Sequence, residues 1–246
     1  MMNAMNQLQY RDEFVAALAN YQPSDQAKQL LARVKLALLV GPSSSGRNTI
    51  INQLLESPAY HFIVSDTTRK PRQNNGVLEQ NGREYWFRTE ADLLQDIKNG
   101  AFLEAAVIHD QQVSGISMRE LAAAADTNSV AINEIEVVGA ENIHGAKPDT
   151  QFFFILPPSF DEWMVRMNGR GTLPSEEVTR RLHSAVNEIQ LALTRDYYQF
   201  VVNDTFKQTA EHIDAMIMTG DYQNDQAHGR EVAQQLLIDT QKHLGL

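Results

Sequence analysis

The sequence predicts an α/β fold in which helices cover both faces of a parallel sheet. The first observation is a set of continuous apolar runs, which is typical of strands that are buried on both faces. The second is that segments of helical period separate these runs, with no tight hairpin between them. The predicted core strands are residues 36–40, 129–135, 152–156 and 200–203.

Residues 1–34 predict two helices that precede the first core strand. Phe14, Leu18 and Tyr21 fall on one helical face, and Pro23 marks a break before the second helix. We interpret this segment as an N-terminal helical extension whose role the sequence does not reveal.

The first core strand ends in a glycine-rich turn that predicts a phosphate-binding loop. Gly41 and Gly46 keep the spacing G-x-x-x-x-G, and an apolar helical stripe follows. Such a loop turns its backbone N–H groups around an anion at the N-terminus of the next helix. Arg47 stands where lysine is usual, and Asn48 where a serine or threonine usually holds Mg²⁺. The residues predicted to bind ATP here are Gly41, Ser43, Ser44, Ser45, Gly46, Arg47, Asn48 and Thr49.

Residues 65–117 predict a small lobe inserted into the α/β core. The lobe opens with the run SDTTRKPR, which concentrates hydroxyls and cations. Thr89 is a predicted helix cap, with acidic residues in the first turn after it. The predicted strands are 61–64 at the entry of the lobe, then 84–87, and an antiparallel pair at 102–109 and 112–116.

The last third of the chain predicts a long amphipathic helix at 175–194, before the final core strand. A polar tail starts at about residue 220. Val232 and Leu236 indicate one more helix in this tail. The sequence pattern does not indicate which element this helix packs against.

Composition excludes several classes of protein. The chain of 246 residues has 43% hydrophobic residues, enough for one sizeable core with a small extra lobe. It contains no cysteine, which excludes disulfides and thiolate metal sites. The net charge of −10 argues against nucleic-acid binding. Because no apolar run approaches the length needed to cross a bilayer, we expect a soluble cytoplasmic protein with no membrane partner.

The order of motifs from about residue 36 to 206 resembles guanylate kinase, a nucleoside-monophosphate kinase of the P-loop class. The motifs are GPSSSGRNT, SDTTRKPR, NGREYWF, FLEAAVIH, EIEVVGA, FILPPS, MNGRGT, SEEVTRRL and VVND. The resemblance implies a three-layer P-loop NTPase core spanning 35–219, with 65–117 as the GMP-binding lobe, 166–181 as a helical lid, and 220–246 as a C-terminal tail. It also implies ATP as the phosphoryl donor, with Mg²⁺, and GMP as the acceptor.

The resemblance carries residue roles onto matching positions of this chain. It assigns the GMP phosphate to Arg69, Arg72 and Tyr85, and the base to Ser65, Glu104 and Glu136. The implied catalytic cations are Arg47 and the lid arginines Arg166, Arg170 and Arg181. Asn203 matches the motif near the adenine of ATP, and Asn48 and Glu136 match positions near the metal.

Four departures from the family pattern keep alternative functions open. They are Arg47, Asn48, Glu136 in place of an aspartate, and the run Gln111–Gly115, where the family has a tyrosine pair. The leading hypothesis is transfer of the ATP γ-phosphate to GMP. The alternatives are a catalytically impaired module that binds a nucleotide or a protein, and a kinase for another monophosphate.

Overall fold

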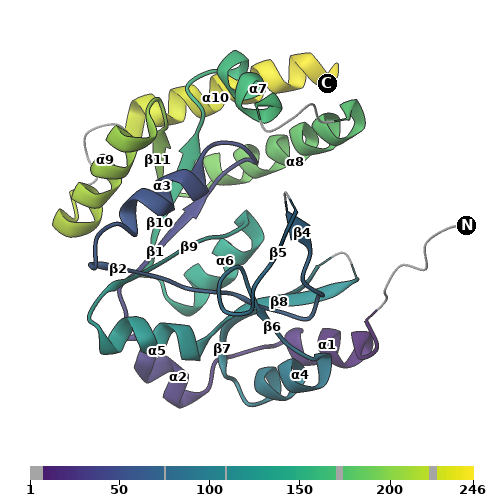
Figure 1. Cartoon of the computed structure of the whole chain (residues 1–246). Helices are drawn as coiled ribbons and strands as arrows, with labels where there is room; N and C mark the ends of the chain where they lie inside the picture. The colour runs from purple at the N-terminus through teal and green to yellow at the C-terminus, as the bar shows by residue number, and fades with distance from the viewer. Residues whose placement is uncertain (1–7, 75, 109, 170–173, 222–225) are drawn as a thin grey trace, which may run out of the picture. The chain divides into compact units, whose positions relative to one another are not determined.

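The computed structural model describes residues 8–74, 76–108, 110–169, 174–221 and 226–246 (Figure 1). The chain forms two compact units. The lobe unit comprises 1–35, 61–131 and 141–148, and the loop unit comprises 36–60, 132–140 and 149–246. The loop unit contains the predicted phosphate-binding loop, and the lobe unit contains the whole of the predicted insertion, 65–117.

A parallel sheet forms the centre of the loop unit, as the apolar runs predicted. β1 (Leu36–Val40) pairs in parallel with β10 (Gln151–Leu156), which pairs in parallel with β11 (Tyr198–Val202). The full strand order is β11-β10-β1-β9-β2, where β9 is Val130–Glu134 and β2 is Tyr60–Phe62. The chain passes from one unit to the other within β9 and β2. Every residue of β1 is buried, which explains why this strand lacks polar alternation.

Helices of the loop unit pack in pairs around its sheet. α3 (Arg47–Leu54) packs against α9 (Phe206–Thr219), a helix that the sequence analysis did not predict. α8 (Ser175–Leu193) is the predicted long helix, and it packs against α10 (Gln226–Leu244). The tail helix therefore exists, and its partners are α8, β11 and α7 (Phe160–Asn168).

The lobe unit has a second sheet, in the order β6-β3-β8-β7. β7 (Phe102–Ile108) and β8 (Gln112–Ser117) form the predicted antiparallel pair. β3 (Asp66–Thr67) joins β8 to β6 (Trp86–Phe87). A separate short hairpin is formed by β4 (Gln73–Asn74) and β5 (Val77–Leu78).

Among the described residues, five helices belong wholly or mainly to the lobe unit, and two of them come from the N-terminal extension. α1 (Arg11–Leu18) packs against α4 (Glu90–Lys98), and α2 (Asp25–Leu31) packs against α5 (Met118–Asp126). α6 (Val137–Ala146) starts in the loop unit and ends in the lobe unit. The predicted cap of α4 is present, because the Thr89 hydroxyl accepts a hydrogen bond from the Asp92 N–H at 3.1 Å. The N-terminal extension is thus part of the lobe's packing.

No helix among the described residues is long and apolar enough to span a membrane.

We expect Phe14→Ala to destabilise the protein through the lobe unit. Phe14 is fully buried, in a cluster that includes Leu93 of α4 and Phe102 of β7. Removing a buried phenyl ring costs about 3–5 kcal/mol. Urea unfolding followed by circular dichroism measures the loss. Val15→Ala on the same helix is the matched control, because that side chain is 45% exposed. Equal unfolding midpoints for the two variants would show that α1 does not belong to the core.

Candidate functional site

The turn between β1 and α3 has the backbone geometry of an anion-binding loop. Gly41 has a φ of +132°, and a Cβ there would lie 2.4 Å from the carbonyl oxygen of Ile155. Gly46 has a φ of +103°, and its Cβ would lie 2.4 Å from Nδ2 of Asn203. Only glycine fits either position without displacing its neighbours. The two glycines therefore fix the loop's path at its beginning and at the start of α3.

Three side chains from other elements hold this loop. Trp163 of α7 donates its indole N–H to the Ser43 carbonyl at 2.8 Å, and Asn203, after β11, donates from Nδ2 to the Ser45 carbonyl at 2.8 Å. Arg181 of α8 donates from Nη1 to the Ser43 hydroxyl at 3.2 Å. Asn203, predicted near adenine, is completely buried and supports the loop from beneath.

Arg47 lies at the first turn of α3 and is paired with a carboxylate. Its Nε lies 3.3 Å from Oε2 of Glu134, and its Nη1 lies 3.5 Å from the carbonyl oxygen of Ile135. Asn48 meets the same carboxylate. With its amide oriented to satisfy both groups, its nitrogen lies 2.9 Å from each Glu134 oxygen. Glu134 thus joins the two unusual residues of the loop.

Glu134 was not among the predicted site residues, although a signal for it was present. It is the last residue of β9, and polar residues at the carboxyl end of a parallel strand border the ligand crevice of open α/β sheets. Glu188 of α8 was also missed. The pKa of Glu188 is raised overall, chiefly by burial. The negative charge of Glu136 also raises this pKa, whereas the positive charge of Arg47 lowers it. Arg47 therefore lies in an acidic environment.

The predicted lid arginines occupy different environments. Arg166 pairs with Glu162 at 2.9 Å, and its Nη1 donates to the Asn203 carbonyl at 2.9 Å. It therefore links α7 to the segment after β11. Arg181 pairs with Glu177 at 2.7 Å while also reaching Ser43. Arg170 lies outside the residues that the structure describes.

In the lobe unit, a buried ion pair organises the predicted phosphate-binding arginines. Arg69 binds Glu79 through two hydrogen bonds, of 2.5 and 2.9 Å, and both side chains are nearly buried. Glu79 also accepts a hydrogen bond from the Arg72 N–H at 2.8 Å. The Arg69 guanidinium lies 4.6 Å from the centre of the Tyr85 ring. The structure therefore brings Arg69, Arg72 and Tyr85 together, and Glu79 is the member that the sequence analysis missed.

Glu104 lies on β7, opposite Ile116 of β8, and is buried. Burial raises the pKa of Glu104 to about 8, while a hydrogen bond with the Ile116 backbone acts in the opposite direction. Ser65, also predicted in this region, is half-buried, and its carbonyl accepts a hydrogen bond from the Trp86 N–H at 2.9 Å.

Comparison with known proteins decides the family. The guanylate kinase family model matches residues 33–219. The chain belongs to the guanylate kinase family. A guanylate kinase from Corynebacterium diphtheriae is 33% identical over 186 residues, covering 75% of this chain and 94% of that protein. A Nostoc guanylate kinase is 35% identical over 184 residues, covering 74% and 89%. The crystal structure of guanylate kinase from Anaplasma phagocytophilum has a TM-score of 0.56 at 25% identity, covering 78% of this chain and 88% of that one.

Membership of the guanylate kinase family confirms the resemblance and the fold predicted from the motifs. The matched segment excludes α1, α2 and α10, which therefore lie outside the family model. Glu136, predicted near both metal and base, is exposed and directly precedes α6.

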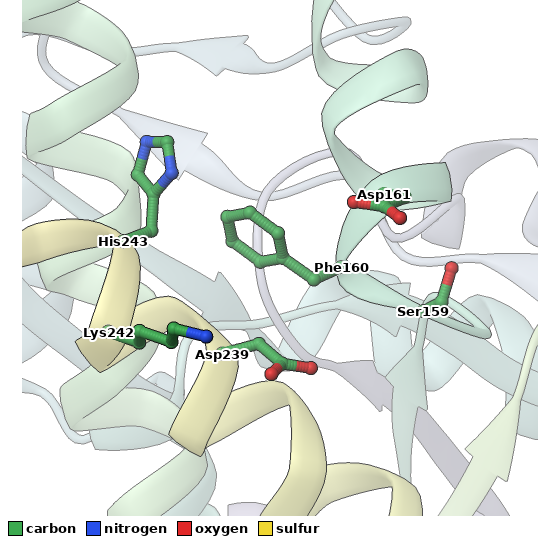
Figure 2. A pocket seen from close by; sticks show the side chains of 6 residues that line it. All are labelled: Ser159, Phe160, Asp161, Asp239, Lys242 and His243. Atoms are coloured by element: carbon green, nitrogen blue, oxygen red, sulfur yellow. The ribbon is translucent and has the colours of Figure 1, made fainter.

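A surface hollow of about 430 Å³ lies between α7 and α10 (Figure 2). Figure 2 shows the Phe160 ring between the α10 side chains and those of Ser159 and Asp161. The Phe160 and His243 ring centres are 5.2 Å apart. The described residues that line the hollow include none of the predicted nucleotide-binding residues.

We expect Glu104 to make stability fall as the pH rises. The pKa of Glu104 is about 8 in the folded protein, against an ordinary value of 4.5. Between these values the folded state holds a proton that the unfolded state has released, so the free energy of unfolding decreases with increasing pH. The contribution of the protonated Glu104 to the free energy of unfolding is fully present below pH 4.5, and it is lost by about pH 8. At about 1.4 kcal/mol per pKa unit, the loss amounts to a few kcal/mol.

Urea unfolding of wild type and Glu104→Gln, from pH 4.5 to pH 8, measures this effect. Glutamine cannot ionise, so the variant is expected to lose less stability than wild type across the range. Glu13→Gln, at an exposed position on α1, is the control and is expected to follow wild type. Parallel curves for wild type and Glu104→Gln would contradict the prediction.

Proposed function

We propose that this chain transfers the γ-phosphoryl group of ATP to GMP, giving ADP and GDP. The observation that carries the proposal is the loop Gly41–Thr49, whose glycine geometry forms an anion cradle with Arg47 and Arg181 at its edge. In a chain of the guanylate kinase family, this loop takes the phosphates of ATP. Residues 65–117 are the GMP-binding lobe, and 166–181 are the lid.

The donor phosphates are held by backbone N–H groups and by the N-terminus of α3. Arg47 and Arg181 supply positive charge, and each has a carboxylate partner that a phosphate must replace or share. Phosphoryl transfer depends mainly on positioning and on neutralising charge, so cations delivered to the phosphates account for the catalysis. Asn203 and Trp163 contribute by holding the loop in shape.

The donor atoms around the loop fit Mg²⁺ bound chiefly through the nucleotide. Glu134, Glu136 and the Asn48 amide offer oxygen atoms, which Mg²⁺ prefers. Among the described residues, no group of three or more histidine, cysteine, aspartate or glutamate side chains is arranged to hold a metal. Asn48, Glu134 and Glu136 would hold the ion beside the phosphates of the nucleotide. When bound, it neutralises charge on the transferred phosphoryl group.

The GMP phosphate is held by Arg69, Arg72 and Tyr85. Ser65, which precedes them in the chain, contacts the base. Glu79 and the Lys70 carbonyl accept three hydrogen bonds from the Arg69 guanidinium, and the Tyr85 side chain is a further hydrogen-bond partner. The Glu79 pair also fixes the guanidinium plane against Tyr85, so the phosphate site is ordered before the ligand arrives.

Glu104 recognises the guanine ring. Its carboxylate accepts the N1–H and the 2-amino group, a pair of donors that adenine does not offer. Glu136 is the second acidic residue assigned to the base. Because Glu104 binds guanine in its ionised form, guanine binding and loss of the Glu104 proton are linked.

A coupled assay for nucleoside diphosphate tests the proposed function. We expect turnover with MgATP and GMP or dGMP, and none with AMP, UMP or CMP. Arg47→Ala is expected to lower kcat by about 100-fold, because it removes a cation from the developing charge. Lys207→Ala is the control, since it removes an exposed cation from α9 of the same unit.

Two outcomes of this assay would overturn the proposal. Measurable GMP binding without any GDP product would indicate a binding module instead of an enzyme. Turnover with a different monophosphate would indicate a kinase of other specificity. The relatives named guanylate kinase favour the enzyme over both alternatives.

A further inference from the structure

The N-terminal extension contributes directly to the core that surrounds β7. Leu8 and Phe14 are buried with Leu93, Phe102 and Val113 in one cluster, and Tyr21 packs against its edge. The family model begins at residue 33, so these N-terminal residues lie outside it. The lobe unit therefore depends on side chains that the family segment does not contain.

One hydroxyl of this extension binds both backbone groups of a β7 residue. Tyr21 donates its O–H to the Phe102 carbonyl at 2.7 Å and accepts the Phe102 N–H at 2.8 Å. β7 is an edge strand of its sheet, so its outward backbone groups need partners from elsewhere. Nearby, the Ser24 N–H donates to the Gly100 carbonyl at 3.0 Å. Tyr21 and Ser24 therefore hold the start of β7 through backbone hydrogen bonds.

This attachment is located at an irregularity in the strand. The pairing of β7 with β8 shifts register between Phe102 and Glu104, which is the mark of a β-bulge. A bulge bends the strand and changes where the next side chains point. The direction of the Glu104 side chain therefore depends on how the backbone at Phe102 is held.

On the side of β7 that faces β8, the backbone at Glu104 is closely packed. Gly115 of β8 lies so close that a Cβ there would be 2.4 Å from the Glu104 carbonyl oxygen and 2.7 Å from Cβ of Ala105. The backbone at Glu104 is therefore confined by β8 on one side, while Tyr21 holds the outer edge two residues earlier. The Tyr21 side chain is also close enough for Glu104 to raise its pKa, in addition to the larger effect of burial.

We propose that Tyr21 is a positioning residue for Glu104, and through it sets how well the lobe distinguishes guanine from other purines. The inference rests on the proposed function, in which Glu104 accepts two hydrogen bonds from guanine. Tyr21 acts through its two hydrogen bonds to the Phe102 backbone. It fixes the backbone at the bulge so that the buried carboxylate meets both donors of the base.

Tyr21→Phe tests the proposal, because it keeps the ring and removes the hydroxyl. The readout is kcat/KM for GMP divided by kcat/KM for inosine monophosphate, which has the N1–H but lacks the 2-amino group. We expect this ratio to fall about tenfold in the variant, as for the loss of one well-made hydrogen bond. KM for GMP is expected to rise, and KM for ATP to stay within about twofold of wild type, because the loop and β7 belong to different units.

The matched control is Tyr60→Phe. Tyr60 of β2 also donates a buried hydroxyl hydrogen bond, to Asp214 of α9. We expect this variant to unfold at a lower temperature with an unchanged ratio between the two nucleotides. All assays are run well below the lower of the two unfolding midpoints, so that loss of folded protein does not contribute.

The outcomes separate the two proposals. An unchanged ratio in Tyr21→Phe, with GMP turnover intact in wild type, would overturn the positioning role and leave the proposed function standing. An equal fall in the ratio for both variants would also overturn it, because general destabilisation would then explain the effect. Absence of GMP turnover in wild type would instead refute the proposed function.

Discussion

The structure of the loop unit depends on the close approach of two glycines to neighbouring backbone and side chains. Gly41 can pass over the Ile155 carbonyl only because β1 and β10 pair in parallel and bring that residue beneath the turn. Gly46 can meet Asn203 only because β11 ends at the same edge. The loop is therefore a product of strand order as much as of its own sequence. This explains why a completely buried asparagine that follows a distant strand is hydrogen-bonded to the loop.

Local patterns were enough to predict the elements whose signals are local. The apolar run of β1, the Thr89 cap of α4 and the antiparallel pair of β7 and β8 all follow from period and capping. α6 was missed because its sequence, VVGAENIHGA, contains two glycines and two valines that lower helix propensity, so tertiary packing decides its state. The order of the core strands along the chain could thus be predicted from the sequence, whereas some of the helices could not.

The site was predictable only where a family motif marks the residue. Arg47, Arg69, Tyr85 and Glu104 stand in such motifs, and the structure describes each of them in a partly or wholly buried setting. The partners Glu79, Glu134 and Tyr21 were missed because their roles come from contacts across the fold. No spacing within the sequence indicates that a hydroxyl at residue 21 meets a strand at residue 102.

Three cations of the candidate site share one electrostatic feature, since each of them pairs with a carboxylate. Arg47 has Glu134, Arg69 has Glu79, and Arg181 has Glu177. In a chain of net charge −10, these pairs hold the guanidinium groups in place. A phosphate ligand then competes with a carboxylate instead of with water, which favours groups carrying more than one negative charge.

The contact between Tyr21 and Phe102 also constrains how the lobe folds. The two residues are separated by 81 positions, so the hydroxyl cannot find its partners until β7 has formed. Closing a loop of this length carries an entropy cost that local helix formation does not, and such non-local contacts slow folding. The entropy cost of joining the N-terminal extension to β7 is therefore part of the cost of forming the lobe unit.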